Sequence, residues 1–267
     1  MFADVKYVEL PIGVRVQYVE QGSPSGVPVL MLHGYSDSWH SFEPVLPFLP
    51  SSIRAFALSQ RGHGNTARPS VGYGPDDFAA DVAEFMDALD IESAIVVGHS
   101  LGSVIAQRFA LDYPERTKGL VLIGSGPAMR GLPAWTELRA PVFGLTDPVD
   151  PRFVREFQQS TLAQPIPPTF LDKVVQESRK LPARVWRSIW RDFSEVDHSD
   201  ELSQLKAPTL VAWGDRDSVF GRSEQDAIIA AVPGARLVVY NGAGHGTHWE
   251  EPERFASDLV AFVRRVA

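Results

Sequence analysis

Residues 96–102 read VVGHSLG and place one serine, Ser100, between two glycines at the end of an apolar, β-branched run. The following residues, VIAQRF at 104–109, have helical character. A strand, a sharp turn with serine at its apex and a helix together form a nucleophile elbow, which exposes the hydroxyl above a sheet and strains the serine backbone. A side chain at Gly98 or Gly102 would collide with the neighbouring helix or strand. The pattern therefore predicts Ser100 as a nucleophile.

A serine hydroxyl is a weak nucleophile at neutral pH, so it needs a base to take its proton and an acid to orient that base. Two later segments supply such groups at the ends of apolar runs. GDRD at 214–217 follows the run 209–213, and NGAGHGTHW at 241–249 follows the run 235–240. The run that ends at Ile123 is followed by GSG, which offers no carboxylate.

These motifs occur in the order serine, acid, histidine, and the chain resembles the α/β-hydrolase superfamily in its lid-bearing branch of esterases, lactonases and carbon–carbon bond hydrolases. The resemblance extends from the HG turn at 33–34 to EEPERF at 250–255. In similar sequences the second acid of Gly-Asp-X-Asp usually belongs to the triad, which implies Asp217. The histidine of Gly-X-Gly-His implies His245 as the base.

Two alternatives remain for these roles. Asp215 is the alternative acid, and its other expected role is to cap the turn after the strand. His248 is the alternative base, and it is otherwise expected to pack near the pocket mouth with Trp249.

The tetrahedral intermediate of acyl transfer carries a negative oxygen, which two preorganised backbone N–H groups can stabilise. One donor is expected at Leu101, directly after the nucleophile. The resemblance places the other at the Tyr35 backbone, within the loop LHGYSD at 32–37. The side chain of His33 is expected to brace this loop, and His99 is expected to be structural.

The elements that must position these groups can be read from the apolar runs. Buried strand-like runs alternate with helix-like segments, which predicts an α/β fold with a mostly parallel sheet of about eight strands and helices on both faces. Alternating residues at 5–10 and 14–18 predict an antiparallel start to the sheet. The expected helices of this part cover residues 75–89, 100–113, 222–232 and 253–266.

Residues 126–203 break this rhythm, because they contain no strand-like run. A structureless loop of that length is implausible in a compact domain, and candidate helices cover residues 151–160, 167–180 and 183–193. We therefore expect a core domain of residues 1–125 and 204–267 with an inserted helical cap, or lid, at 126–203. The aromatic residues expected to line an apolar substrate pocket under it are Trp135, Phe143, Trp186 and Trp190.

Composition excludes several classes of function. The net charge is −8, whereas a nucleic-acid-binding protein is expected to have a basic face. The absence of cysteine excludes disulfides and thiolate metal sites, and no His-Glu-X-X-His pattern occurs, so neither a metal nor a cofactor is expected. No apolar run approaches the roughly 20 residues of a membrane helix. No secretory signal is visible at the start, so we expect a cytoplasmic protein without membrane association.

The residues and the resemblance together predict a serine hydrolase that cleaves carboxylic esters of small to medium apolar molecules through an acyl-enzyme. A lactonase or a carbon–carbon bond hydrolase would use the same triad. The latter needs charge for an acidic dienoate, which Arg184, Arg187 or Arg191 could supply. Acyl transfer to peroxide or alcohol is a further variant, and a ligand receptor or signalling protein with slow turnover is an alternative of another class. The sequence does not indicate an oligomeric state.

Overall fold

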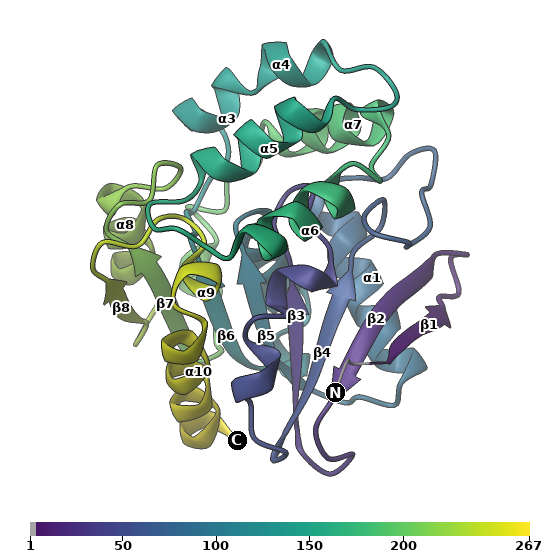
Figure 1. The fold of residues 1–267 in the computed structure, drawn as a ribbon. Coiled ribbons are helices and arrows are strands. Elements are labelled where there is room, and N and C mark those ends of the chain that lie inside the picture. The colour runs from purple at the N-terminus through teal and green to yellow at the C-terminus, as the bar shows by residue number, and fades with distance from the viewer. Residues whose placement is uncertain (1–3) are drawn as a thin grey trace.

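The computed structural model describes residues 4–267, which contain one eight-stranded sheet with the order β1-β2-β4-β3-β5-β6-β7-β8 (Figure 1). In chain order the strands are β1 (Val5–Glu9), β2 (Arg15–Gln21), β3 (Val27–Leu32), β4 (Ile53–Ser59), β5 (Ala94–His99), β6 (Thr117–Ile123), β7 (Thr209–Gly214) and β8 (Arg236–Tyr240). Strand β2 pairs antiparallel with β1 and β4, and every other pair is parallel. The predicted architecture is confirmed.

Helices cover both faces of this sheet (Figure 1). One face carries α1 (Pro75–Ala88), α2 (Leu101–Asp112) and α8 (Arg222–Ala231), and the other carries α10 (Pro252–Val266) with the 3₁₀ turns η1 (Trp39–Phe42) and η2 (Leu46–Phe48). Successive strand residues point to opposite faces. In β3, Leu30 belongs to the apolar cluster on the face covered by α1, α2 and α8, and Met31 belongs to the cluster on the face covered by α10. Both side chains are fully buried. The continuous apolar runs therefore follow from a sheet that is covered on both sides.

Helices α1 and α10 show why the expected helix ends were close to the observed ones. Helix α1 begins at Pro75, where a missing N–H costs nothing, and the Gly74 N–H donates to the Asp77 carboxylate at 3.0 Å. Helix α10 buries Phe255 and Leu259 on the stripe that faces the sheet. Among residues 4–267, no helix combines the length and apolar character needed to cross a bilayer.

Five helices lie between β6 and β7, beyond the carboxyl ends of the parallel strands (Figure 1). They are α3 (Pro133–Glu137), α4 (Arg139–Phe143), α5 (Pro151–Ser160), α6 (Pro168–Ser178) and α7 (Ala183–Phe193). We call this group the α3–α7 layer. The expected helices at 151–160, 167–180 and 183–193 match α5, α6 and α7. The two short helices were not predicted, because they are shorter than the window in which helical periodicity becomes visible.

Candidate active site

Strand β5 ends directly before Ser100, whose φ of +53° and ψ of −119° lie outside the regions that L-residues favour. The tight turn depends on both flanking glycines. A Cβ atom at Gly98 would lie 2.2 Å from the Gly102 carbonyl oxygen, and a Cβ atom at Gly102 would lie 2.2 Å from the Leu32 carbonyl oxygen in β3. The strained serine and the two collisions are therefore present, as the sequence pattern predicts.

The imidazole of His245 and the carboxylate of Asp217 form a buried pair. Nδ1 of His245 lies 2.9 Å from Oδ2 of Asp217, and both side chains are almost fully enclosed. The second carboxylate oxygen, Oδ1, accepts backbone N–H groups from Val219 and Phe220 at 2.7 and 3.1 Å. These bonds fix the carboxylate, which holds the histidine with Nδ1–H toward the acid and leaves Nε2 as an acceptor.

The alternative acid and base occupy other positions. Asp215 is exposed, and its carboxylate accepts the Gly242 N–H at 2.6 Å, which is the turn-capping role. His248 is fully buried, with Nε2 3.1 Å from the Ser41 hydroxyl. The expected contact with Trp249 is present, at a centroid distance of 5.6 Å, but the expected place near the pocket mouth was wrong. His248 does not line the pocket, and its ring packs against His99 at a centroid distance of 4.5 Å. Burial lowers the pKa of His248 to about 3.

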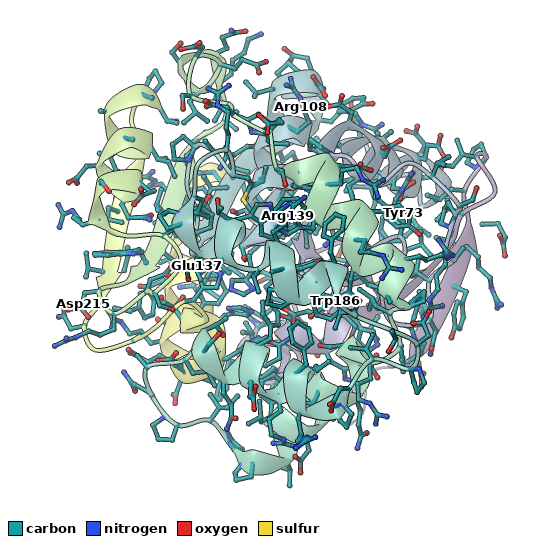
Figure 2. All side chains as sticks on the ribbon, turned by 90° about the horizontal axis from the view of Figure 1, so that it is seen from above. Tyr73, Arg108, Glu137, Arg139, Trp186 and Asp215 are labelled. Atoms are coloured by element: carbon teal, nitrogen blue, oxygen red, sulfur yellow. The ribbon has the colours of Figure 1, made fainter. Side chains whose placement is uncertain are left out.

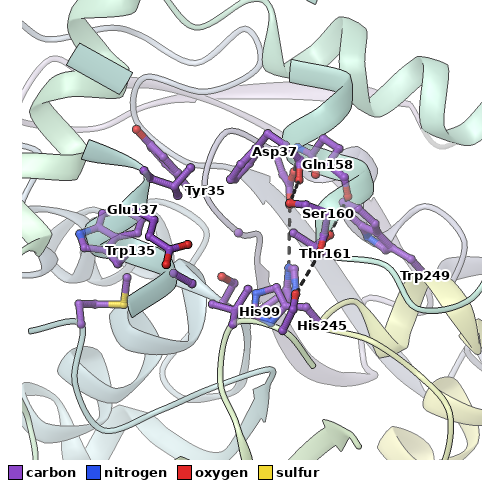
Figure 3. Close-up of a pocket in the computed structure, with 18 residues that line it drawn as sticks. Tyr35, Asp37, His99, Trp135, Glu137, Gln158, Ser160, Thr161, His245 and Trp249 are labelled. Atoms are coloured by element: carbon purple, nitrogen blue, oxygen red, sulfur yellow. Dashed lines mark hydrogen bonds and ion pairs between the residues drawn. The ribbon is translucent and has the colours of Figure 1, made fainter. Parts of the chain in front are cut away.

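Ser100 and His245 line one pocket of about 350 Å³ under the α3–α7 layer (Figure 3). Its other walls come from six parts of the chain: the loop after β3, the end of β5, the segment between β6 and α3, the α3–α7 layer, the loop after β7 and the short helix α9 (Thr247–Glu250). The residues are Gly34, Tyr35, Asp37, His99, Met129, Ala134, Trp135, Glu137, Leu138, Phe157, Gln158, Ser160, Thr161, Ser218, Val219 and Trp249. In residues 4–267, no hydrogen bond joins the Ser100 hydroxyl to His245, and no group of three His, Asp or Glu side chains could hold a metal ion.

Only one of the four aromatic residues expected in the pocket lines it, namely Trp135. Trp186 is fully buried and packs against the Tyr35 ring at 4.8 Å. Trp190 stacks on Trp135 at 6.4 Å, and Phe143 is 40% exposed beside Trp190. The expectation was wrong for these three, because helical spacing identifies an apolar face but not the neighbour that the face packs against.

The two expected oxyanion donors lie in suitable elements. Leu101 is the first residue of α2, where backbone N–H groups have no intrahelical partner. Tyr35 belongs to the pocket wall, and its hydroxyl donates to the Trp186 carbonyl at 2.6 Å. His33 braces this loop, because its Nε2 accepts the Gln60 N–H at 3.0 Å. The donor roles of Tyr35 and Leu101 stay predictions.

Among the polar pocket residues not singled out from the sequence, three carry a carboxyl or amide group: Asp37, Glu137 and Gln158. Asp37 is 3% exposed, and its carboxylate accepts the Gln158 side-chain N–H at 2.9 Å. Burial raises the pKa of Asp37 to about 7, against the opposing effect of that hydrogen bond. The signal for Asp37 was its place in the loop after β3, which is expected to carry an oxyanion donor. Gln158 gave only the weak signal of a polar residue on the apolar side of a helix.

Comparisons with known proteins identify the family of this chain. The model of the alpha/beta hydrolase fold family matches residues 27–252. A non-heme chloroperoxidase of Streptomyces lividans is 30% identical over 273 residues, covering 94% of this chain and 97% of its own length. A 2-hydroxy-6-oxononadienedioate/2-hydroxy-6-oxononatrienedioate hydrolase of Paraburkholderia phymatum is 30% identical, covering 98% and 96%. The solved structure of an esterase from Rhodococcus sp. superposes with a TM-score of 0.87 at 25% identity, covering 98% and 99%.

Proposed function

We propose that this chain, which belongs to the α/β-hydrolase fold family, is a serine hydrolase that cleaves carboxylic esters of small to medium apolar molecules. The observation that carries the proposal is the shared pocket of Ser100 and His245, with Asp217 bound to the far side of the imidazole. A strained serine, a base within the same cavity and a fixed carboxylate are the parts that acyl transfer needs.

In the acylation step, Nε2 of His245 takes the proton from the Ser100 hydroxyl while Oγ attacks the ester carbonyl. Asp217 keeps the imidazole oriented and stabilises its positive charge. The backbone N–H groups of Leu101 and Tyr35 hold the developing oxyanion, an interaction for which one donor is typically worth about 10²–10³ in kcat. The imidazolium then protonates the departing alcohol, which leaves an acyl group on Ser100.

In the deacylation step, His245 removes a proton from a water molecule that attacks the acyl carbonyl, and then returns the proton to Oγ of Ser100 as the acid departs. The structure has no hydrogen bond between these two side chains. Such bonds are often long without substrate and tighten in the reacting complex. We include the α3–α7 layer in the proposal as the lid, because Trp135 and Phe157 from this layer form the wall above the serine.

A carbon–carbon bond hydrolase function has less support, because the pocket formed by the described residues lacks the positive charge that an acidic dienoate would need. None of the three candidate arginines lines the pocket. Arg184 donates to the Pro69 carbonyl at 2.8 Å, Arg187 donates to the Leu145 carbonyl at 2.9 Å, and Arg191 is exposed. A lactonase would use the same site without further charge, so the proposal includes lactones, which are cyclic esters.

Acyl transfer to peroxide is a second candidate, favoured by the names of relatives. The chloroperoxidase of Streptomyces lividans and a haloperoxidase of Rhodococcus erythropolis, which is 28% identical, are both described as non-heme enzymes. In this reaction hydrogen peroxide replaces water at the acyl-enzyme, and a peracid leaves. The measurement is peracid formation from an ester, or from its free acid, in the presence of hydrogen peroxide.

The proposed function is tested with 4-nitrophenyl esters of graded acyl length. We expect rapid turnover by the unaltered protein and loss of turnover in Ser100→Ala, with Ser257→Ala as the control on the exposed side of α10. A fluorophosphonate should label Ser100 alone. Label on another residue, or equal turnover in both variants, would contradict the nucleophile. Tight ligand binding with very slow turnover would favour the receptor alternative.

A further inference from the structure

The charged groups at the pocket wall are of one sign. Asp37 lies in its depth and Glu137 at its rim, whereas no lysine or arginine occurs among the wall residues that the structure describes. Figure 3 shows the Glu137 carboxylate directed into the pocket. Within residues 4–267, no ion pair joins Glu137 to a cation. The Ser100 pocket therefore holds carboxyl groups without a compensating cationic side chain in its wall.

The nearest arginine in the sequence, Arg139, is engaged elsewhere. Its guanidinium lies 5.4 Å from the Phe143 ring centroid and 6.0 Å from that of Trp190. Neither of these aromatic residues lines the pocket. Figure 2, which views the α3–α7 layer from above, shows Arg139 and Glu137 at separate positions on it. Arg139 therefore stabilises the outer aromatic contacts of the layer and does not neutralise the rim of the pocket.

The histidine in the pocket wall beside Asp37 does not supply positive charge either. Nδ1 of His99 lies 3.9 Å from the Asp37 carboxylate, and both side chains are buried. Burial, with His248 and His245 as neighbours, lowers the pKa of His99 well below its ordinary value. His99 is therefore neutral near pH 7 and leaves the field of the two carboxyl groups uncompensated.

We propose that this pocket selects esters whose acyl part is uncharged or cationic and rejects esters whose acyl part carries a carboxylate, with Glu137 as the residue that sets this selection at the rim. The inference rests on the proposed function. A carboxylate on the substrate would lose its water shell in the pocket and meet the Glu137 carboxylate at the rim and, in its ionised form, the Asp37 carboxylate in the depth. The relative from Paraburkholderia phymatum, by contrast, is named for dioate substrates, which are dicarboxylates.

The test compares three probes of matched length: the 4-nitrophenyl esters of pentanoic acid, of glutaric acid with one free carboxylate, and of 4-(trimethylammonio)butanoic acid. At low ionic strength we expect kcat/KM for the glutarate ester to be at least about 10-fold below that for the pentanoate ester. The trimethylammonio ester should equal or exceed the pentanoate ester. The ratio of glutarate to pentanoate kcat/KM should rise about threefold or more in Glu137→Gln, because a like charge is removed.

The matched control is Glu156→Gln, which changes an exposed carboxylate on α5 that does not line the pocket. In Glu156→Gln the ratio of glutarate to pentanoate kcat/KM should equal that of the unaltered protein. A glutarate ester cleaved as fast as the pentanoate ester, or an equal ratio in both variants, would overturn the inference and leave the proposed function intact. Absence of Ser100-dependent turnover with all three esters would overturn the proposed function, and this inference with it.

Discussion

The side-chain amide of Gln158 donates a hydrogen bond of 2.9 Å to the carboxylate of Asp37, across 121 residues of sequence. The same nitrogen lies 3.0 Å from the hydroxyl of Ser178 in α6. Gln158 belongs to α5, and Asp37 belongs to the loop that carries Tyr35. The bond therefore couples the position of the α3–α7 layer to the loop expected to hold the oxyanion.

Replacement of Gln158 by alanine should weaken this coupling. We expect a loss of about 1–3 kcal/mol in the free energy of unfolding, because a buried carboxyl group loses a donor. The pKa of Asp37 should rise further, since the bond to Gln158 lowers it, and kcat on neutral esters should fall. Urea unfolding and steady-state kinetics measure these effects. The exposed neighbour provides the control Gln159→Ala, and equal stability and kcat in both variants would contradict the coupling.

Replacement of Asp217 by asparagine should reduce kcat by about 10⁴, the effect of the same change in the general triad template, because the amide favours the wrong histidine tautomer. Asp215→Asn should change kcat by less than about threefold, since that side chain caps a turn away from the imidazole. The comparison of kcat for the two variants on one ester checks the assignment. A larger loss with Asp215→Asn would reverse it.

The elbow glycines should not tolerate a methyl group. Gly102→Ala would place Cβ 2.2 Å from the Leu32 carbonyl oxygen, so we expect destabilisation of at least about 3 kcal/mol, at the upper end of overpacking effects. Gly144→Ala is the control, because its Cβ would meet its nearest neighbours at 3.4 Å. Urea midpoints of the two variants measure the difference. Equal midpoints would mean that β3 and α2 can separate without cost.

Stability should fall as the pH is lowered from 6.5 to 5. Burial lowers the pKa of His33 and His99 well below 6.5, that of His63 to about 4 and that of His248 to about 3. Between those values and 6.5 the unfolded chain binds more protons than the native one, so unfolding is favoured by about 1 kcal/mol per pH unit for each group. Asp37, with its pKa raised to about 7, acts in the opposite direction, as do Asp81 and Glu250, whose pKa values burial also raises.

The pH dependence is measured as the free energy of unfolding in urea at several pH values. In His248→Asn the free energy of unfolding should change less steeply with pH below pH 6. The slope should correspond to about one bound proton fewer, because one group that titrates only in the unfolded chain is removed. A free energy of unfolding that is flat or rising between pH 6.5 and 5 would contradict the neutral, buried state of these histidines.

Trp135 lines the pocket and Phe143 does not, so their replacement should affect substrate preference differently. Trp135→Ala enlarges the pocket and removes apolar contact, so kcat/KM for medium-chain esters should fall by about 10-fold or more relative to the acetate ester. Phe143→Ala should leave that ratio within about twofold, since Phe143 is 40% exposed and outside the pocket. The chain-length profile of each variant is the measurement, and an equal shift in both would contradict the assigned wall.

The sequence alone was sufficient for features that depend on neighbours along the chain. The elbow at Ser100, the start of α1 at Pro75 and the parallel strands follow from local sterics, helix-end chemistry and apolar runs. The serine, acid and histidine motifs could also be located from the sequence, because each one stands at the end of an apolar, strand-like run. Each of these features depends on a few consecutive residues, so a short sequence pattern is enough to predict it.

Only the tertiary structure decided which side chains meet. It paired His245 with Asp217 and left Asp215 in its turn, directed Trp186 and Trp190 into the α3–α7 layer, and brought Glu137 to the pocket rim. Periodicity records that a face is buried, but the neighbour of that face depends on how distant elements pack. The choice between Asp215 and Asp217 therefore lies in how the loops after β7 and β8 meet. The choice among the aromatic residues lies in the packing of the α3–α7 layer.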